Sequence, residues 1–414
     1  MAQNPAPRDS TDADTTRWFA LSFQQTTVTQ THLGFRSPYS GTNSLQKEAE
    51  GATSLTATFF ASARLLPWLK AYFHPELAGG AGVSRALGVA GFMNGETFRV
   101  GDPKPQFYVA RCYLQANQKW GDGGSLHLEA GKFSLADFFD QNAASHDPRS
   151  RFLNWALMSN GAWDYPANTR GYTWGVVAGF TKGHWGLQGA VSLVPEHANG
   201  AQLDLTIGQN RGHVLELTRS WSEDTRRAGA IRLLGFYNQA RMGNYRQTLD
   251  LYARGDQDTL SIVSTRKPGR GKVGFGISAD QRLGDVVLFA RAGYNDGRNE
   301  TWAFTEIDQT LSGGAILEMT RFKRPEDILG IAFAANGISS EHRDYLAAGG
   351  YGFMIGDGRL PHYGPECALE IFYLMMLHDK HFYLTPDYQF ILNPGYNQDR
   401  GPVHVFAVRL HTEF

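Results

Sequence analysis

The sequence predicts an all-β protein, a closed transmembrane antiparallel β-barrel of about 16 strands. Three features of the chain lead to this fold: a recurring period-2 alternation, aromatic residues at the ends of the alternating segments, and ionisable residues opposite the apolar face. A sealed core does not accept unpaired charges in mid-strand, whereas the lumen of a membrane barrel does. We therefore expect the apolar face to meet lipid and the polar face to line a lumen.

The final segment, 403–414, shows the alternation most clearly. Its apolar face consists of Phe406, Val408, Leu410 and Phe414. Its opposite face consists of Val405, Ala407, Arg409, His411 and Glu413. A strand that ends abruptly on Phe414 resembles the C-terminal signal of bacterial outer-membrane barrels, so we expect this strand to engage the outer-membrane assembly machinery.

The same alternation recurs in six other segments. They are residues 55–65, 107–115, 172–181, 184–193, 369–377 and 382–392. In the segment 107–115, the pattern places Phe107 and Arg111 on one face and Tyr108 and Cys112 on the other. The aromatic residues expected to form an interfacial girdle are Tyr172, Trp174, Phe180, Trp185 and Phe414.

Composition excludes several classes of protein. The formal net charge of −1 argues against a nucleic-acid partner, which would need a basic surface. The chain contains no apolar run near the roughly 18 residues that a spanning helix needs. Cys112 and Cys367 are the only cysteines, and we expect two free thiols because they are far apart in the sequence.

The chain is expected to form one barrel domain over residues 17–414, preceded by a disordered segment over residues 1–16. Residues 1–16 are polar and lack the apolar stretch of a signal peptide. We therefore expect the sequence to be a mature form. Nothing between residues 17 and 414 has the composition of an interdomain linker.

The predicted connections differ in length between the two ends of the barrel. Residues 182–183 and 283–285 are tight turns, whereas residues 78–105 and 243–271 are long connections, as in outer-membrane barrels. The stretch Ser150–Ser159 has apolar residues at helical spacing, and residues 79–101 are irregular and rich in glycine. We expect these two segments to fold inward and narrow the lumen.

Five blocks of sequence resemble the OprB-type carbohydrate-selective porin family of Gram-negative outer membranes. They are PYSGTNSL at 38–45, the Gly-rich stretch 73–96, FYVARCYLQ at 107–115, the block 133–175 and the closing segment 385–414. The resemblance implies passive diffusion of mono- or oligosaccharides into the periplasm through a monomer or weak oligomer. It implies an outer-membrane location, contact with lipid and no cofactor.

The candidate pore-lining residues are polar side chains expected to point into the lumen. Sugars are neutral polyols that bind through planar donors, carboxylate acceptors and aromatic faces. The candidates are Arg64, Glu76, Asn94, Glu96, Arg111, Asp147, Arg149, Asp387 and Arg409. Arg111 and Arg409 are the first choices because both lie in segments that resemble strands of the family.

Two interpretations of the inward charges remain open. The resemblance places the block around Asp147 and Arg149 at the constriction of the pore. Alternatively, Asp147 before Pro148 is helix-start chemistry in a solvated loop. The other inward charges could form a selective eyelet or a paired wall that stiffens the lumen.

The alternative functions are an outer-membrane barrel hydrolase, an exopolysaccharide export channel and a soluble carbohydrate-binding domain. The 13 histidines show no HxH or HExxH spacing, and no G-x-S-x-G elbow follows a strand. We therefore expect no metal site and no enzymatic activity. The residues leave open the preferred sugar, its size limit, the direction of flux and the oligomeric state.

Overall fold

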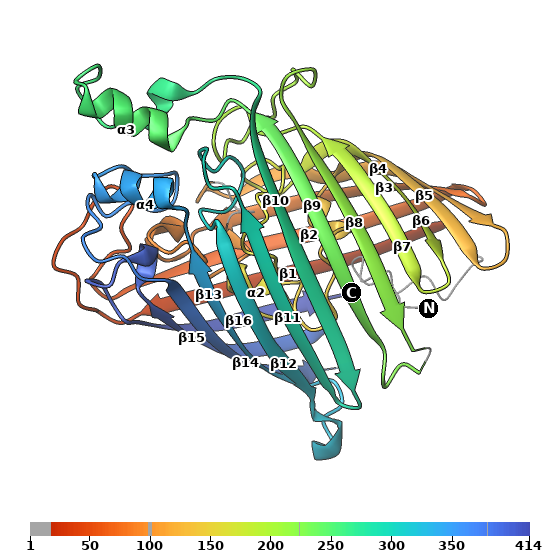
Figure 1. The fold of residues 1–414 in the computed structure, drawn as a ribbon. Coiled ribbons are helices and arrows are strands. Elements are labelled where there is room, and N and C mark those ends of the chain that lie inside the picture. The colour runs from red at the N-terminus through yellow and green to blue at the C-terminus, as the bar shows by residue number, and fades with distance from the viewer. Residues whose placement is uncertain (1–17, 98–101, 223, 379) are drawn as a thin grey trace.

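The computed structural model describes residues 18–97, 102–222, 224–378 and 380–414 and shows a closed antiparallel barrel of sixteen strands (Figure 1). Every strand pairs with its neighbours in sequence, and β1 closes the barrel against β16. The predicted fold class and strand number are confirmed. The expected disordered segment, residues 1–16, lies outside the described residues.

The strands are 8 to 17 residues long, enough to cross a bilayer at a tilt. They are β1 Phe19–His32, β2 Glu50–Leu66, β3 Leu69–Gly80, β4 Gln106–Trp120, β5 Gly124–Phe133, β6 Thr173–Lys182, β7 Trp185–Ser192, β8 Arg211–Trp221, β9 Gly229–Ala240, β10 Arg270–Leu283, β11 Val286–Asn295, β12 Gln309–Glu318, β13 Ile328–Gly337, β14 Glu366–His378, β15 Phe382–Leu392 and β16 Val403–Glu413. The helices are short. They are α2 Trp155–Met158, α3 Tyr245–Ala253, α4 Ser340–Ala347 and the 3₁₀ turns η1 Val83–Ala86, η2 Leu135–Asp137, η3 Ile262–Thr265, η4 Met319–Phe322 and η5 Pro394–Tyr396.

The two faces of β16 divide as predicted. Leu410 is 50% exposed on the outer surface, whereas His411 is 5% exposed and Arg409 is fully buried on the inner side. The outward row of β16 is apolar and meets lipid, and the inward row carries the polar groups. The alternation read from the sequence therefore identifies the lipid face of this strand correctly.

The alternation in β4 is broken, and the sequence assignment before Arg111 is wrong. Phe107 is 72% exposed on the outside, while the hydroxyl of Tyr108 reaches an inward carboxylate. Between β3 and β4, His74 pairs with Arg111 and Pro75 pairs with Val109, so Ala110 has no partner residue on β3. Proline has no N–H for the ladder, so the partner strand forms a β-bulge there and the side-chain phase shifts by one residue.

The aromatic girdle is confirmed for four of its five predicted members. Trp174, Phe180, Trp185 and Phe414 are all exposed on the outer surface. Tyr172 was assigned wrongly, because it precedes β6 and is fully buried inside the barrel. A phenol hydroxyl finds a polar partner more easily in the lumen than in lipid.

The connections have the predicted asymmetry. The β6–β7 and β10–β11 connections contain two residues each, whereas the long loops at the other end carry α3 and α4 (Figure 1). These two helices meet where Tyr245 stacks on His342, with ring centroids 4.5 Å apart. Cys112 and Cys367 are free thiols, as expected.

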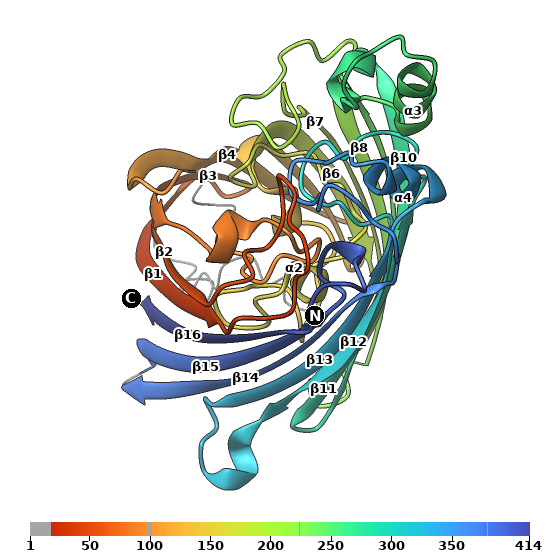
Figure 2. The same cartoon turned by 90° about the vertical axis from the view of Figure 1, so that its left-hand side faces the viewer.

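Residues 150–159 and residues 81–97 of the two predicted in-folded stretches lie inside the barrel, and Figure 2 shows α2 within the ring of strands. Residues 98–101 of the second stretch lie outside the described residues. The helix expected over 150–159 is shorter than predicted. Residues 150–154 form turns and extended chain, and the helix begins at Trp155 with Asn154 as its N-cap. In the second stretch, Gly79 and Gly80 belong to the end of β3, and the described residues that follow are irregular apart from η1.

Candidate functional site

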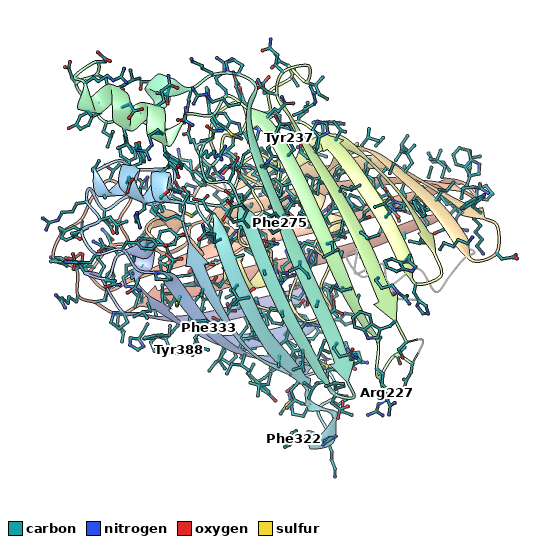
Figure 3. All side chains as sticks on the ribbon, in the orientation of Figure 1. Arg227, Tyr237, Phe275, Phe322, Phe333 and Tyr388 are labelled. Carbon is teal, nitrogen blue, oxygen red and sulfur yellow. The ribbon has the colours of Figure 1, made fainter. Side chains whose placement is uncertain are left out.

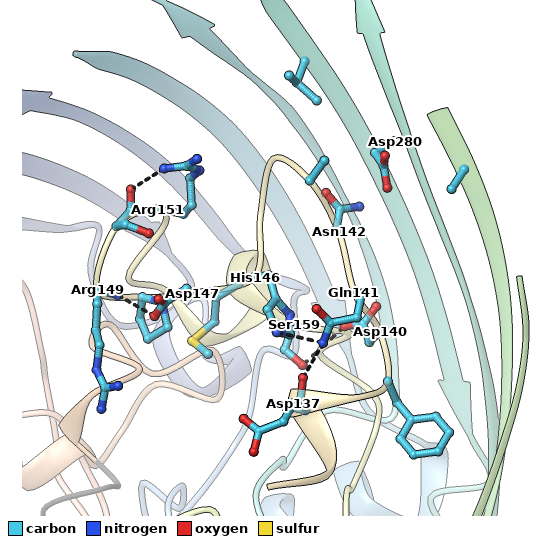
Figure 4. A pocket seen from close by; sticks show the side chains of 18 of the residues that line it. Asp137, Asp140, Gln141, Asn142, His146, Asp147, Arg149, Arg151, Ser159 and Asp280 are labelled. Atoms are coloured by element: carbon cyan, nitrogen blue, oxygen red, sulfur yellow. Dashed lines mark hydrogen bonds between the residues drawn. The ribbon is translucent and has the colours of Figure 1, made fainter. Parts of the chain in front are cut away.

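The connection between β5 and β6, residues 134–172, folds into the lumen of the barrel. A cavity of about 1050 Å³ lies beside it. The cavity continues toward the end of the barrel that carries the short turns, where Gly183 and His184 also line it. Figure 4 shows the polar side chains of the connection around this cavity, with Asp280 on the facing wall. This inward fold is what narrows the barrel.

Buried wall residues hold the connection in place through its own backbone. The Glu370 carboxylate accepts hydrogen bonds from the amides of Leu153 at 2.5 Å and Asn154 at 2.8 Å. The Arg409 guanidinium donates to the carbonyls of Pro148 at 2.5 Å and Arg151 at 2.7 Å. Charged groups bonded to an irregular backbone satisfy polar atoms that would otherwise be buried without partners.

A second anchor lies on β11, three strands away from β14 around the barrel. Arg291 is fully buried, and its Nε lies 2.9 Å from Asp140 Oδ1. The same guanidinium donates to the carbonyls of Ser145 at 2.5 Å and Leu157 at 3.1 Å. The connection is therefore attached to both β11 and β14 and is preorganised rather than loose.

Arg111 presents a planar donor group at the edge of the cavity. Its Nε and Nη2 lie 2.7 Å and 2.5 Å from the two carboxylate oxygens of Asp137, a bidentate pair. The guanidinium also lies 5.2 Å from the ring centre of Tyr172, within cation–π range. Asp137 and Tyr172 thus fix the direction in which the guanidinium faces.

Arg149 joins the connection to the β2–β3 wall. Its Nη2 lies 3.2 Å from Glu76 Oε2, and its Nε lies 3.1 Å from Glu96 Oε2. Two threonine hydroxyls of β2 donate to the same carboxylates, Thr58 to Glu76 and Thr56 to Glu96, each at 2.6 Å. These buried charges are paired and hydrogen-bonded, as burial requires.

The nine predicted site residues fall into three groups. Arg111, Asp147 and Arg149 line the cavity. Five lie buried beneath its surface. Glu76, Asn94, Glu96 and Arg409 make contacts between the wall and the in-folded segments, whereas Asp387 accepts from Gln389 of the same strand. Arg64 is half-buried near the end of β2 and does not belong to the lining.

Asp147 does not begin a helix. Its carboxylate accepts the amide of Arg149 at 3.0 Å, and its carbonyl accepts the amide of Arg151 at 2.8 Å. These bonds form a turn that places the Arg149 side chain toward the wall. The polar stretch around Asp147 therefore lines the cavity instead of lying in open solvent.

Sequence reasoning missed several lining residues. Gln141, Arg151 and Arg170 lie on the in-folded connection, where no alternation reveals direction. Asp280 and Arg282 of β10 also line the cavity. Asp280 pairs with Arg232 of the neighbouring β9 at 2.5 Å, and Arg282 reaches across β11 to Glu318 of β12 at 2.8 Å. The period-2 alternation of β10 could have predicted that Asp280 and Arg282 point inward, because both residues lie on the same row of this strand.

The lining of the cavity is close to electrically neutral. It contains six arginines and seven carboxylates. Burial lowers the pKa of His146 below its usual value, so this lining histidine stays neutral near pH 7. Among the described residues, no group of His, Cys, Asp and Glu side chains could hold a metal ion. A neutral polar solute matches such a lining better than an ion of either sign.

Known families provide a direct comparison for this barrel. The family model described as carbohydrate-selective porin, OprB family, matches residues 43–414. The chain belongs to this family. The porin is therefore an outer-membrane channel through which sugars diffuse, as the sequence predicted.

Solved structures similar to this porin support the fold. The high-pH structure of Pseudomonas putida OprB is 16% identical, with a TM-score of 0.72 over 96% of this chain and 94% of that chain. The outer-membrane channel DcaP of Acinetobacter baumannii is 10% identical, with a TM-score of 0.53 over 96% of this chain and 97% of that chain. A search of curated proteins found no match.

Proposed function

We propose that neutral sugars pass a constriction formed by residues 133–155 together with Arg111, with Asp147 and Arg149 at its edge. A sixteen-strand barrel without an inward fold is a wide, unselective pore. Selectivity needs donors and acceptors at contact distance that nevertheless release the solute. The in-folded connection, held by Glu370 and Arg291, supplies a surface of this kind.

The observation that carries this proposal is the balance of charge around a single cavity. Guanidinium groups in the lining form ion pairs with carboxylates, such as Arg111 with Asp137 and Arg232 with Asp280. Each pair offers a donor and an acceptor to hydroxyl groups but attracts neither cations nor anions strongly. This pattern favours a neutral polyol over a sugar acid or a sugar phosphate.

Three lining residues retain unused hydrogen-bonding capacity. Gln141 Oε1, Trp155 Nε1 and Arg170 Nη1 are buried atoms with no hydrogen-bond partner among the described residues. One is an acceptor and two are donors, but neighbouring atoms enclose all three, so they belong to the packing beneath the cavity lining and not to the surface that a solute contacts.

One chain encloses a complete lumen, so we propose that a monomer or weak oligomer carries out transport into the periplasm without a cofactor and without catalytic activity. Conductance in planar bilayers tests the proposal. Glucose and maltose are expected to reduce the ion current reversibly, whereas gluconate at equal ionic strength is expected to block it less. Equal block by neutral and acidic sugars would contradict the charge argument.

A further inference from the structure

The outer surface of β8, β9 and β10 changes from apolar to basic toward the end that carries the long loops. The outward rows of these three strands follow from their register. From mid-barrel toward the long loops, the rows are Leu217–Leu233–Ile277, Leu215–Gly235–Phe275, His213–Tyr237–Val273 and Arg211–Gln239–Gly271. We call these twelve residues the β8–β10 outer surface. Figure 3 labels Tyr237 and Phe275, with Tyr237 nearer the long loops.

A gap interrupts the apolar part of the β8–β10 outer surface. Leu215 is 57% exposed and Phe275 is 63% exposed, and Gly235 lies between them in the same row. A Cβ placed on Gly235 would have no heavy atom within 4 Å. The missing side chain leaves a slot between two protruding apolar side chains, wide enough for an alkyl chain to lie against the backbone.

Three basic side chains lie at the edge of the β8–β10 outer surface nearest the long loops. They are Arg211, Arg241 and Lys267. Contacts between loops bring them together: Gly269 N donates to Asn210 Oδ1 at 2.9 Å, and Lys267 N donates to the carbonyl of Met242 at 3.1 Å. Arg270 is not one of them, because it pairs with the buried Ala240 on the inner row.

These cations lack carboxylate partners, unlike Arg111 and Arg149 of the lumen. In the part of the chain that the structure describes, none of the three forms an ion pair. Arg211 donates to the carbonyls of Ile207 and Gly208 and to His213. Asp204 lies near Arg241, but its carboxylate is already bonded to Thr206 and Asn210.

We propose that the β8–β10 outer surface and these three cations bind a phosphorylated, acylated lipid of the outer leaflet. The long loops mark the cell-surface end of the barrel, so the cations lie at the headgroup level of that leaflet. The lipid phosphates meet Arg211, Arg241 and Lys267, and one acyl chain lies over Gly235. Charge complementarity and the adjoining apolar slot together select a lipid over a soluble anion. The proposal is independent of which sugar the lumen conducts.

Native mass spectrometry of the detergent-purified full chain tests this lipid site. The probes are bis-phosphorylated lipid A, dephosphorylated lipid A, phosphatidylglycerol and inorganic phosphate. The variant Arg211→Gln/Lys267→Gln is expected to weaken lipid A binding roughly 30-fold, from the contribution of two surface cations. The matched control is Arg227→Gln/Arg254→Gln, which removes two exposed cations outside the β8–β10 outer surface.

A second variant separates the acyl slot from the charges. Gly235→Leu fills the slot without touching the cations and is expected to weaken lipid A binding while leaving barrel folding unchanged, because the new side chain has open space. Three outcomes would overturn the proposal: unchanged affinity in the Arg211→Gln/Lys267→Gln variant, equal affinity for dephosphorylated lipid A, or binding of inorganic phosphate as tight as that of lipid A. Sugar conductance serves as the independent check that each variant is folded.

Discussion

Arg149 and Glu76 form a buried ion pair beside the cavity. Arg149 Nη2 lies 3.2 Å from Glu76 Oε2, with the two side chains 7% and 0% exposed. The pair joins the connection that narrows the lumen to β3, the third strand of the wall. Removing one member of a buried pair costs about 3–5 kcal/mol, because the remaining charge stays buried without its partner.

Arg149→Ala is therefore expected to release this side of the constriction. Glu76 and Glu96 would face each other without a cation, and the connection would move away from the wall. Single-channel recordings should show a larger and noisier ion conductance, and the thermal unfolding temperature should fall. Arg85→Ala, which removes an exposed arginine, serves as the control. Identical traces for the two variants would contradict an anchoring role for Arg149.

Arg111→Ala is expected to raise ion conductance and weaken sugar block, because the change widens the cavity edge and removes a fork donor. Arg111→Lys keeps the charge but loses the bidentate geometry with Asp137. Sugar affinity should then fall more than conductance changes. Titration of the current with glucose measures both quantities. If Arg111→Ala alters neither, the constriction lies elsewhere and Arg111 belongs to the passive wall.

An arginine on the lipid face of β16 should impair membrane insertion. Val408→Arg or Leu410→Arg is expected to cost about 2–4 kcal/mol if the position is near the bilayer centre. His411→Arg should be mild, because His411 lines the cavity and hydrogen-bonds Thr26 Oγ1 at 2.8 Å. Urea unfolding in lipid vesicles measures the difference. Equal losses on the two faces would contradict the assignment of the faces.

Deletion of Phe414 should slow assembly into the outer membrane more than it destabilises the folded barrel. The Phe414 backbone exchanges two hydrogen bonds with Phe23 of β1, at 2.8 Å and 2.9 Å. The ring contacts His381 and Phe382 only at the edge of the barrel. Surface labelling in cells and heat-induced unfolding of the purified protein separate the two effects. Normal surface levels of the truncated chain would refute this prediction.

The loop network around Glu306 predicts a pH dependence at the cell-surface end. Burial raises the pKa of Glu306 to about 7, and the nearby His342 opposes this shift. Because the folded state holds the proton more tightly than the unfolded state, the loops gain stability that is complete below about pH 4.5 and is lost as pH rises toward 7. The protection factors of the Met354 and Ile355 amides, which donate to this carboxylate, should fall over that range once the intrinsic pH dependence of exchange is removed.

Glu306→Gln removes the titrating group from this network. The protection factor of the same two amides, which is the exchange rate of an unstructured peptide relative to that of the amide, should then lose most of its dependence on pH between 4.5 and 7. Glu341→Gln, which changes a half-buried carboxylate on α4, is the matched control and should retain the dependence. A pH profile that survives Glu306→Gln would assign the effect to another group.

The sequence by itself determined the barrel and its lipid face. In β16, neighbouring side chains must point to opposite sides of the sheet, so the positions of Leu410 and His411 in the sequence decide which meets lipid. The same rule holds for most strands, which is why the strand number could be counted. The rule failed at Pro75, because the bulge that proline imposes on the partner strand shifts the phase and cannot be located from β4 alone.

Only the tertiary structure decided which charges reach the cavity. Arg111 and Arg409 occupy similar inward positions in the sequence pattern, yet Arg111 lines the cavity while Arg409 is buried under the carbonyls of the in-folded connection. An inward position in the alternation indicates that a side chain points away from the lipid. Whether that side chain is exposed to the cavity depends on which in-folded segments pack over it. That packing joins residues more than a hundred positions apart, such as Glu370 and Leu153, and no local periodicity encodes such a contact.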